Sequence, residues 1–145
     1  MILALDTDVI VGWMAPESPG HDRASSLVSR HLRQSGGASL GLTEQVLHEF
    51  LHIVTDSRRF ERPVEMARAV TLARQLWDSR DAVRIRPGPG TFHRTLELLE
   101  RHRLGRKRIL DTAFAATLES AGVKSLATFN GRDFALFEFL EVVEP

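Results

Sequence analysis

The chain has 145 residues, 43% hydrophobic and 26% charged, which is typical of one globular domain spanning residues 1–145. Basic and acidic residues balance at 19 each, so a nucleic acid would have to be attracted by a local basic patch. The lack of cysteine excludes disulfides and thiolate metal sites and is typical of a cytoplasmic protein. We expect no membrane helix, which needs ~20 apolar residues, and no secretory signal.

Strands and helices alternate along the predicted chain. Short apolar runs predict strands, and apolar residues spaced by three and four predict helices. In chain order we expect a strand over 2–5, a helix over 21–33, a strand over 38–42, helices over 43–55 and 63–78, a strand over 83–85, helices over 91–102 and 111–122, a strand over 124–129, a short turn over 134–137 and a strand over 140–143. This alternation predicts an α/β fold with three α/β/α layers and a mostly parallel sheet of about five strands.

Two acidic residues follow predicted strands. Asp6 comes directly after the apolar run 2–5, and Asp133 lies in the loop after the strand over 124–129. The carboxyl ends of parallel strands meet at one edge of a sheet, where α/β folds place their sites, so we expect both side chains there. Each also has a simpler interpretation, because Asp6 could cap the turn that follows it and Asp133 could be an ordinary turn residue.

A third acid belongs to the helix over 43–55, for which Thr43 is a suitable N-cap. Glu44 and Glu49 border the apolar face of this helix on opposite sides. An acid in the first turn, such as Glu44, is favoured by the helix dipole, whereas Glu49 has no such local explanation. The spacing therefore favours Glu49 without deciding between the two.

A fourth acid, Asp111, precedes Phe114, Ala115 and Leu118 by three, four and seven positions. These residues share one helix face, so Asp111 points in the direction of the core. The alternative is an N-cap role for a helix that starts at Thr112.

Carboxylates in such places need compensation, because a buried unpaired charge costs several kcal/mol or more. A divalent cation compensates several carboxylates at once, and oxygen ligands without thiolates favour Mg²⁺ or Mn²⁺ over zinc. Such an ion activates water and neutralises charge on a scissile phosphate. The four acids together therefore suggest a metal-dependent nuclease.

Four segments resemble the motifs of one known family. They are Leu5–Val9, Val46–Leu51, Ile109–Ala113 and Thr128–Phe134. In order and spacing, over residues 2–143, they are similar to the PIN-domain ribonucleases, above all to the VapC-type toxins of bacterial toxin–antitoxin pairs. The resemblance implies an endoribonuclease with an Mg²⁺ or Mn²⁺ site formed by Asp6, Glu49, Asp111 and Asp133.

The resemblance also implies supporting residues and partners. Thr7 and Thr128 match hydroxyls that support the family's metal site. Position 8 is commonly Asn in these proteins, so Asp8 could strengthen metal binding or crowd the site with negative charge. The last motif offers both Asn130 and Asp133, and either could be the fourth ligand. The implied partners are RNA, a second copy in a homodimer and a cognate antitoxin whose C-terminal segment covers the acidic residues.

Basic residues near these acids could hold the phosphates of an RNA. Arginines cluster at 58–62 and 103–108, although such runs are also common on solvated loops. We expect Arg106, Arg108 and Arg132 to bind RNA.

Other functions match parts of the same pattern. His48–His52 fits the H-E-x-x-H motif of zinc hydrolases, but both histidines are predicted on the helix face opposite the apolar residues. Asp6–Asp8 also resembles the nucleophile motif of haloacid-dehalogenase-type phosphatases, with Thr43 as the phosphate-binding hydroxyl, but their late pair of acids is missing because 128–133 carries one Asp. A non-catalytic RNA-binding module is disfavoured, since clustered negative charge does not help RNA binding.

Overall fold

Five short parallel strands form one sheet in the order β3-β2-β1-β4-β5, in a computed structural model that describes residues 1–145. The strands are β1 (Leu3–Leu5), β2 (Leu40–Thr43), β3 (Ala82–Ile85), β4 (Ser125–Ala127) and β5 (Glu141–Val143). The helices are α1 (Thr7–Met14), α2 (His21–Gln34), α3 (Glu44–Val54), α4 (Met66–Asp78), α5 (Thr91–Arg101), α6 (Ile109–Ser120) and α7 (Gly131–Phe134), with a 3-10 turn η1 (Arg106–Arg108) before α6.

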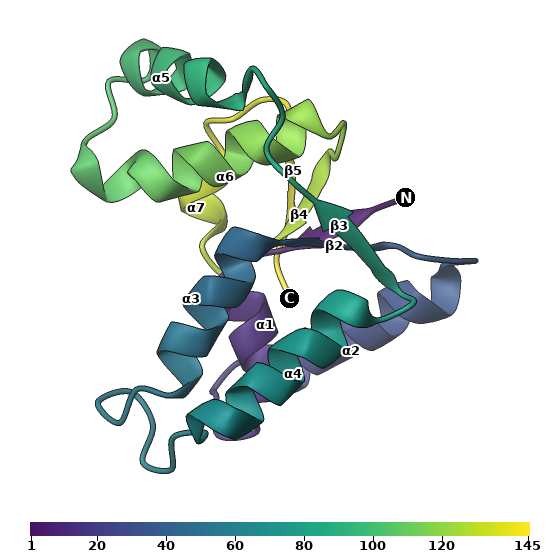
Figure 1. The fold of residues 1–145 in the computed structure, drawn as a ribbon. Coiled ribbons are helices and arrows are strands. Elements are labelled where there is room, and N and C mark those ends of the chain that lie inside the picture. Colours follow the sequence, from purple (N-terminus) through teal and green to yellow (C-terminus); the bar gives the residue numbers. More distant parts are fainter.

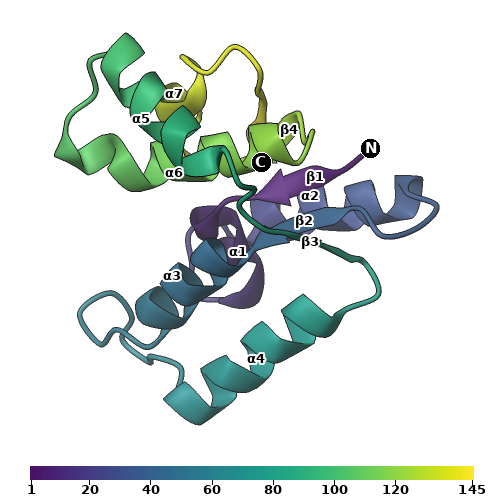
Figure 2. The same ribbon diagram turned by 45° about the horizontal axis from the view of Figure 1, so that its top comes forward.

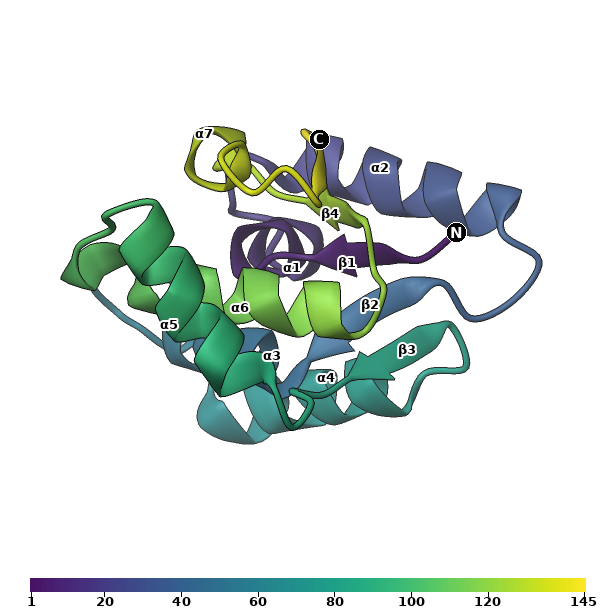
Figure 3. The same ribbon diagram turned by 90° about the horizontal axis from the view of Figure 1, so that it is seen from above.

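Helices cover both faces of this sheet. Figure 1 shows α1, α2, α3 and α4 on one side and α5 and α6 on the other. Figure 3, which looks down on the molecule, shows β4, β1, β2 and β3 side by side. The predicted α/β fold with three layers and a parallel sheet of five strands is therefore confirmed. None of the helices is both long and apolar enough to cross a bilayer.

Two neighbouring strands in the middle of the sheet, β1 and β4, lead into helices of opposite layers. The chain leaves β1 into α1, which packs on α2 and α3, and leaves β4 into α7, which packs on α6 (Figures 1 and 2). Such a divergence opens a crevice where α/β folds bind ligands. The register pairs Leu5 with Ala127, and the Asp6 N–H donates to the Ala127 carbonyl at 3.0 Å. The next residues, Asp6 and Thr128, therefore meet at this edge.

The strands that carry this edge are buried along their length. Leu3, Ala4 and Leu5 of β1 and Leu126 of β4 each have at most 2% of their surface exposed. Continuous apolar strands of this kind fit a sheet that is covered on both faces. Burial of each leucine contributes about 1.5–3 kcal/mol, so the backbone that positions Asp6 is held firmly.

The helix α1 is missing from the sequence-based prediction. Its residues Val9, Ile10 and Val11 are β-branched and have modest helix propensity, so the local sequence does not indicate a helix. All three side chains are buried, and Asp6 caps the helix by accepting a hydrogen bond from the Thr7 N–H. Tertiary packing and this cap stabilise α1 in place of local propensity.

Two predicted helices begin at other residues than expected. α4 begins at Met66 instead of 63, because the Val64 N–H donates to the Val54 carbonyl at 2.8 Å and holds the preceding segment against α3. α6 begins at Ile109 after η1, so Asp111 lies in its first turn and is not its N-cap. The short helix α7 ends at Phe134, and the turn predicted over 134–137 follows it, with the Phe137 N–H donating to the Phe134 carbonyl at 3.0 Å.

Gly41 of β2 marks a close approach to β1. A Cβ atom at Gly41 would lie 2.8 Å from Cδ1 of Ile85 and 3.1 Å from Cα of Ala4. We expect Gly41→Ala to lower the free energy of unfolding by about 1–3 kcal/mol, because the added methyl overpacks the sheet. Urea unfolding measures this effect. Gly37→Ala is the control, since its Cβ would meet no atom within 4 Å; equal unfolding free energies for the two variants would contradict the prediction.

Candidate active site

Asp6 lies at the carboxyl end of β1 and uses both side-chain oxygens. Its Oδ1 accepts a hydrogen bond from the Thr7 N–H at 2.8 Å, and its Oδ2 accepts one from the Thr128 hydroxyl at 2.7 Å. The capping role considered for Asp6 is therefore present, together with its position at the sheet edge. Thr7 and Thr128 are both buried, so these contacts fix the direction of the carboxylate.

The charge of Asp6 is poorly compensated. The pKa of Asp6 is raised to about 7, chiefly by burial and also by the negative charges of Asp8 and Asp111, which together outweigh the lowering effect of the hydrogen bonds from Thr128 and Thr7. A carboxyl with such a pKa is only partly ionised at neutral pH. A cation beside it would favour the ionised form.

Asp8 connects α1 to the loop after β4. Its Oδ2 accepts hydrogen bonds from the Phe129 N–H and from Nδ2 of Asn130, both at 3.1 Å. Its Oδ1 is buried and has no hydrogen-bond partner. Burial raises the pKa of Asp8, although the backbone N–H of Phe129 opposes this shift. Asp8 is therefore a second carboxylate beside Asp6 that lacks a counter-charge.

Glu49 of α3 is connected to the same edge by the hydroxyl of Thr7 in α1. Thr7 Oγ1 donates to Glu49 Oε2 at 2.9 Å. Gln45, one turn earlier, donates to Glu49 Oε1 at 3.2 Å and to the carbonyl of Leu110 at 3.2 Å, which ties α3 to α6. Glu44 is exposed and lies 3.4 Å from Nε of Arg86 instead. Sequence reasoning missed Gln45, although its i, i+4 spacing to Glu49 was a usable signal.

Asp111 and Asp133 are linked through Arg108. Arg108 Nε lies 3.9 Å from Asp111 Oδ2, and Arg108 Nη2 donates to the backbone carbonyl of Asp133. Burial raises the pKa of Asp111, the charges of Asp133 and Glu49 raise it further, and Arg108 lowers it. Asp111 is therefore influenced by two other negative charges and by one arginine.

The acidic side chains lie along one edge of the sheet but do not surround a common point. No group of three His, Asp or Glu side chains is arranged to hold an ion directly. The donor set nevertheless fits Mg²⁺ or Mn²⁺, because every donor is a hard oxygen and Mg²⁺ usually keeps several waters while binding one or two carboxylates. The unpartnered Oδ1 of Asp8 and the raised pKa of Asp6 are the features that a divalent cation would relieve.

The remaining sequence candidates lie around this edge in different environments. Arg106 and Arg132 are exposed, whereas Arg108 is partly buried by its contacts with Asp111 and Asp133. His48 and His52 are exposed on α3, as expected, and do not belong to any metal-binding group. The H-E-x-x-H motif therefore does not form a buried zinc site.

The phosphatase alternative depends on Thr43, which is engaged elsewhere. Thr43 is 4% exposed, and its Oγ1 accepts a hydrogen bond from the Val46 N–H at 3.2 Å as the N-cap of α3. A buried hydroxyl in this role is not available to a phosphate. The geometry therefore does not favour a haloacid-dehalogenase-type site.

Comparisons with known proteins agree with this architecture. The chain is 26% identical over 144 residues to Ribonuclease VapC24 of Mycobacterium tuberculosis, covering 99% of this chain and 97% of that protein. Its fold is similar to that of VapC20 of Mycobacterium tuberculosis, a sarcin–ricin loop cleaving toxin (TM-score 0.70, 17% identity, 93% of this chain and 95% of that one). It is also similar to VapBC-1 of nontypeable Haemophilus influenzae (TM-score 0.66, 15% identity, 99% and 98% covered).

The family assignment comes from a separate comparison, which covers nearly the whole chain. The family model of the PIN domain matches residues 3–140. This span includes the strands β1 to β4 and every acidic residue discussed above. The protein therefore belongs to the PIN domain family.

Proposed function

We propose that this protein is a metal-dependent endoribonuclease that hydrolyses RNA phosphodiester bonds and acts as the toxin of a toxin–antitoxin pair. The observation that carries the proposal is the convergence of acids from four distant segments at the divergence of β1 and β4. The similarity to a protein named as a VapC ribonuclease, over 99% of the chain, supports the choice of RNA as substrate.

In this proposal Asp6, Glu49, Asp111 and Asp133 hold Mg²⁺ or Mn²⁺. The ion, when bound, activates a water and neutralises the charge that develops on the scissile phosphate. Thr128 and Thr7 orient the carboxylates of Asp6 and Glu49 by the hydrogen bonds described above.

Asp8 and Asn130 form the adjoining support. Asp8 positions the loop after β4 by accepting from the backbone of Phe129 and the amide of Asn130. The exposed guanidinium groups of Arg106 and Arg132 hold phosphates of the RNA. Arg108 is mostly engaged with Asp111 and Asp133, so its predicted part in RNA binding is the smallest of the three.

The proposed partners are an antitoxin protein and a second copy of the chain. Several solved structures of similar fold are complexes of a VapC-type toxin with its antitoxin, such as VapBC2 of Rickettsia felis (TM-score 0.63, 15% identity). An antitoxin would inhibit this protein by covering the acids, and a basic segment would suit that purpose because the edge carries excess negative charge.

Removal of one proposed ligand tests the metal-dependent chemistry. We expect Asp6→Asn and Glu49→Gln to lower the rate of RNA cleavage in Mg²⁺ by roughly 100-fold or more, because each loses a charge that holds the ion, equivalent to about 3 kcal/mol. Gel analysis of a defined RNA measures the rate. Glu44→Gln is the matched control on the same helix and should cleave at the wild-type rate. If Asp6→Asn cleaves RNA at the wild-type rate, Asp6 is not a ligand; if the wild type cleaves RNA in excess EDTA, the reaction does not need a metal.

The raised pKa of Asp6 predicts how metal-free protein responds to pH. Its folded-state pKa of about 7 lies above the ordinary 3.8, so the folded state binds the proton more tightly than the unfolded state does. The stabilisation of the folded state by this tighter proton binding is fully present below about pH 4 and is lost as the pH rises through 7. Comparing the wild type with Asp6→Asn isolates it from other titrating groups.

In EDTA we therefore expect Asp6→Asn to melt roughly 3–8 °C above the wild type at pH 8, with the difference shrinking toward pH 5. Mg²⁺ should stabilise the wild type at pH 8 and have little effect on Asp6→Asn. Circular dichroism melts measure both effects. Equal melting temperatures for the two proteins at pH 8, with and without Mg²⁺, would show that Asp6 is not an uncompensated metal ligand.

A further inference from the structure

A pocket of about 330 Å³ opens beside the acidic edge, and no proposed catalytic step uses it. Val11 of α1 and Ile53 of α3 form apolar walls, and Phe129, two residues beyond the end of β4, contributes an aromatic ring. Arg23 of α2 and Arg59 of the loop after α3 bring two cationic groups to the same pocket. Segments far apart in the sequence therefore combine apolar, aromatic and basic groups in one concave site, a typical composition for a ligand pocket.

The pocket is continuous with the acidic edge through Asp8. Asp8 lines the pocket and accepts the hydrogen bond from the Phe129 N–H at 3.1 Å. The Phe129 ring packs closely on Gly20, where a Cβ atom would lie 2.6 Å from Cζ of the ring. The ring is therefore held in a fixed position relative to the acids.

Arg23 extends the aromatic surface. Its guanidinium carbon lies 5.1 Å from the centroid of the Phe129 ring, within the range of a cation–π contact. Arg23 is exposed and makes no ion pair or side-chain hydrogen bond, so its donors and its outer face are free for a ligand. A guanidinium plane stacked on a ring is a surface on which a nucleobase can stack.

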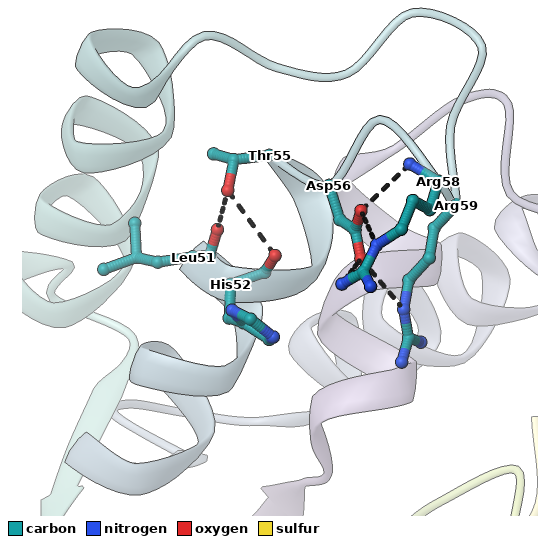
Figure 4. A network of polar contacts seen from close by, with 6 residues as sticks. All are labelled: Leu51, His52, Thr55, Asp56, Arg58 and Arg59. Carbon is teal, nitrogen blue, oxygen red and sulfur yellow. Dashed lines mark hydrogen bonds and ion pairs between the residues drawn. The ribbon is translucent and has the colours of Figure 1, made fainter.

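Arg59 supplies a positive charge, held in place by Asp56. Its Nε lies 3.7 Å from Oδ2 of Asp56, whose side chain is 11% exposed (Figure 4). Asp56 also accepts hydrogen bonds from the backbone and side chain of Arg58, which shapes the loop. Arg58 is 83% exposed and does not line the pocket, whereas Arg59 does. Neighbouring arginines that share one carboxylate therefore differ in their access to the pocket.

We propose that this pocket binds one nucleotide of a single-stranded RNA, next to the phosphate that is cleaved; the inference rests on the proposed function. The base stacks on the surface formed by Arg23 and Phe129, and its phosphate pairs with Arg59. A single strand is required, because a base in a duplex is not free to stack on a protein surface. An acidic peptide could pair with the arginines, but it would gain nothing from the stacking surface.

Equilibrium binding separates this subsite from catalysis. The probe is a short fluorescein-labelled single-stranded RNA, followed by anisotropy in EDTA, where no cleavage is expected. We expect Arg23→Gln and Arg59→Gln each to raise Kd roughly 5- to 20-fold, and Arg59→Gln also to reduce the salt dependence by about one phosphate contact. Phe129→Leu keeps the apolar packing and should raise Kd without changing the salt dependence. Arg58→Gln and Arg30→Gln are controls from the same loop and the same helix, and should bind as the wild type does.

The outcomes distinguish the subsite from the nuclease. Wild-type affinity in Arg23→Gln and Arg59→Gln, with circular dichroism showing folded proteins, overturns the subsite whether or not the protein cleaves RNA. Absence of RNA binding by the wild type also overturns it. Loss of affinity in these variants, combined with no cleavage in Mg²⁺ by the wild type, supports the subsite and contradicts the nuclease. If the variants weaken binding of a labelled polyglutamate peptide and not of RNA, the pocket serves a protein partner and the RNA subsite is wrong.

Discussion

Asp6 is held by two hydrogen bonds at the end of a fully buried strand, and the rest of the site depends on this arrangement. Hydrogen bonds alone do not compensate its charge, because Asp8 and Asp111 add to the negative potential and burial removes water. The fold therefore creates a place where protons or cations bind with favourable free energy. Natural proteins accept such local cost chiefly at functional sites, since elsewhere an apolar residue would be more stable.

The hydrogen bonds around Asp6 also explain how separate elements become one site. Thr7 contacts both acids: its backbone N–H donates to Asp6, the cap of α1, and its hydroxyl donates to Glu49 of α3. Gln45 extends this connection from Glu49 to the backbone of α6. These hydrogen bonds oppose small shifts of α3 or α6, because such shifts would break them. The carboxylates are thus positioned by the protein alone, which would lower the reorganisation needed to bind the proposed ion.

The sequence predicts the parts of this arrangement that depend on short-range patterns. Apolar runs predict the strands, and an acid directly after the run 2–5 predicts Asp6 at the sheet edge. Patterns fail where long-range packing decides: α1 consists of residues that favour strands, and it is helical because its side chains are buried between α2 and α3. The contact that holds Glu49 at the sheet edge likewise comes from Thr7, 42 positions away, which no local pattern contains. The pocket of Arg23, Arg59 and Phe129 was beyond prediction for the same reason.

The protein carries no net charge, which limits how it can attract a polyanion to the acidic edge. With 19 basic and 19 acidic residues, the whole-molecule field neither attracts nor repels RNA strongly, so affinity must come from contacts at short range. The acidic edge by itself opposes the approach of a phosphate. In the proposed nuclease, a cation bound at the acids and the arginines around them would offset that repulsion locally. Because screening at physiological salt limits such interactions to about 8 Å, arginines within the adjoining pocket contribute far more than equal charges elsewhere on the surface. Under the proposed function, a neutral protein would select RNA segments that reach both the ion at the acids and the arginines of the pocket.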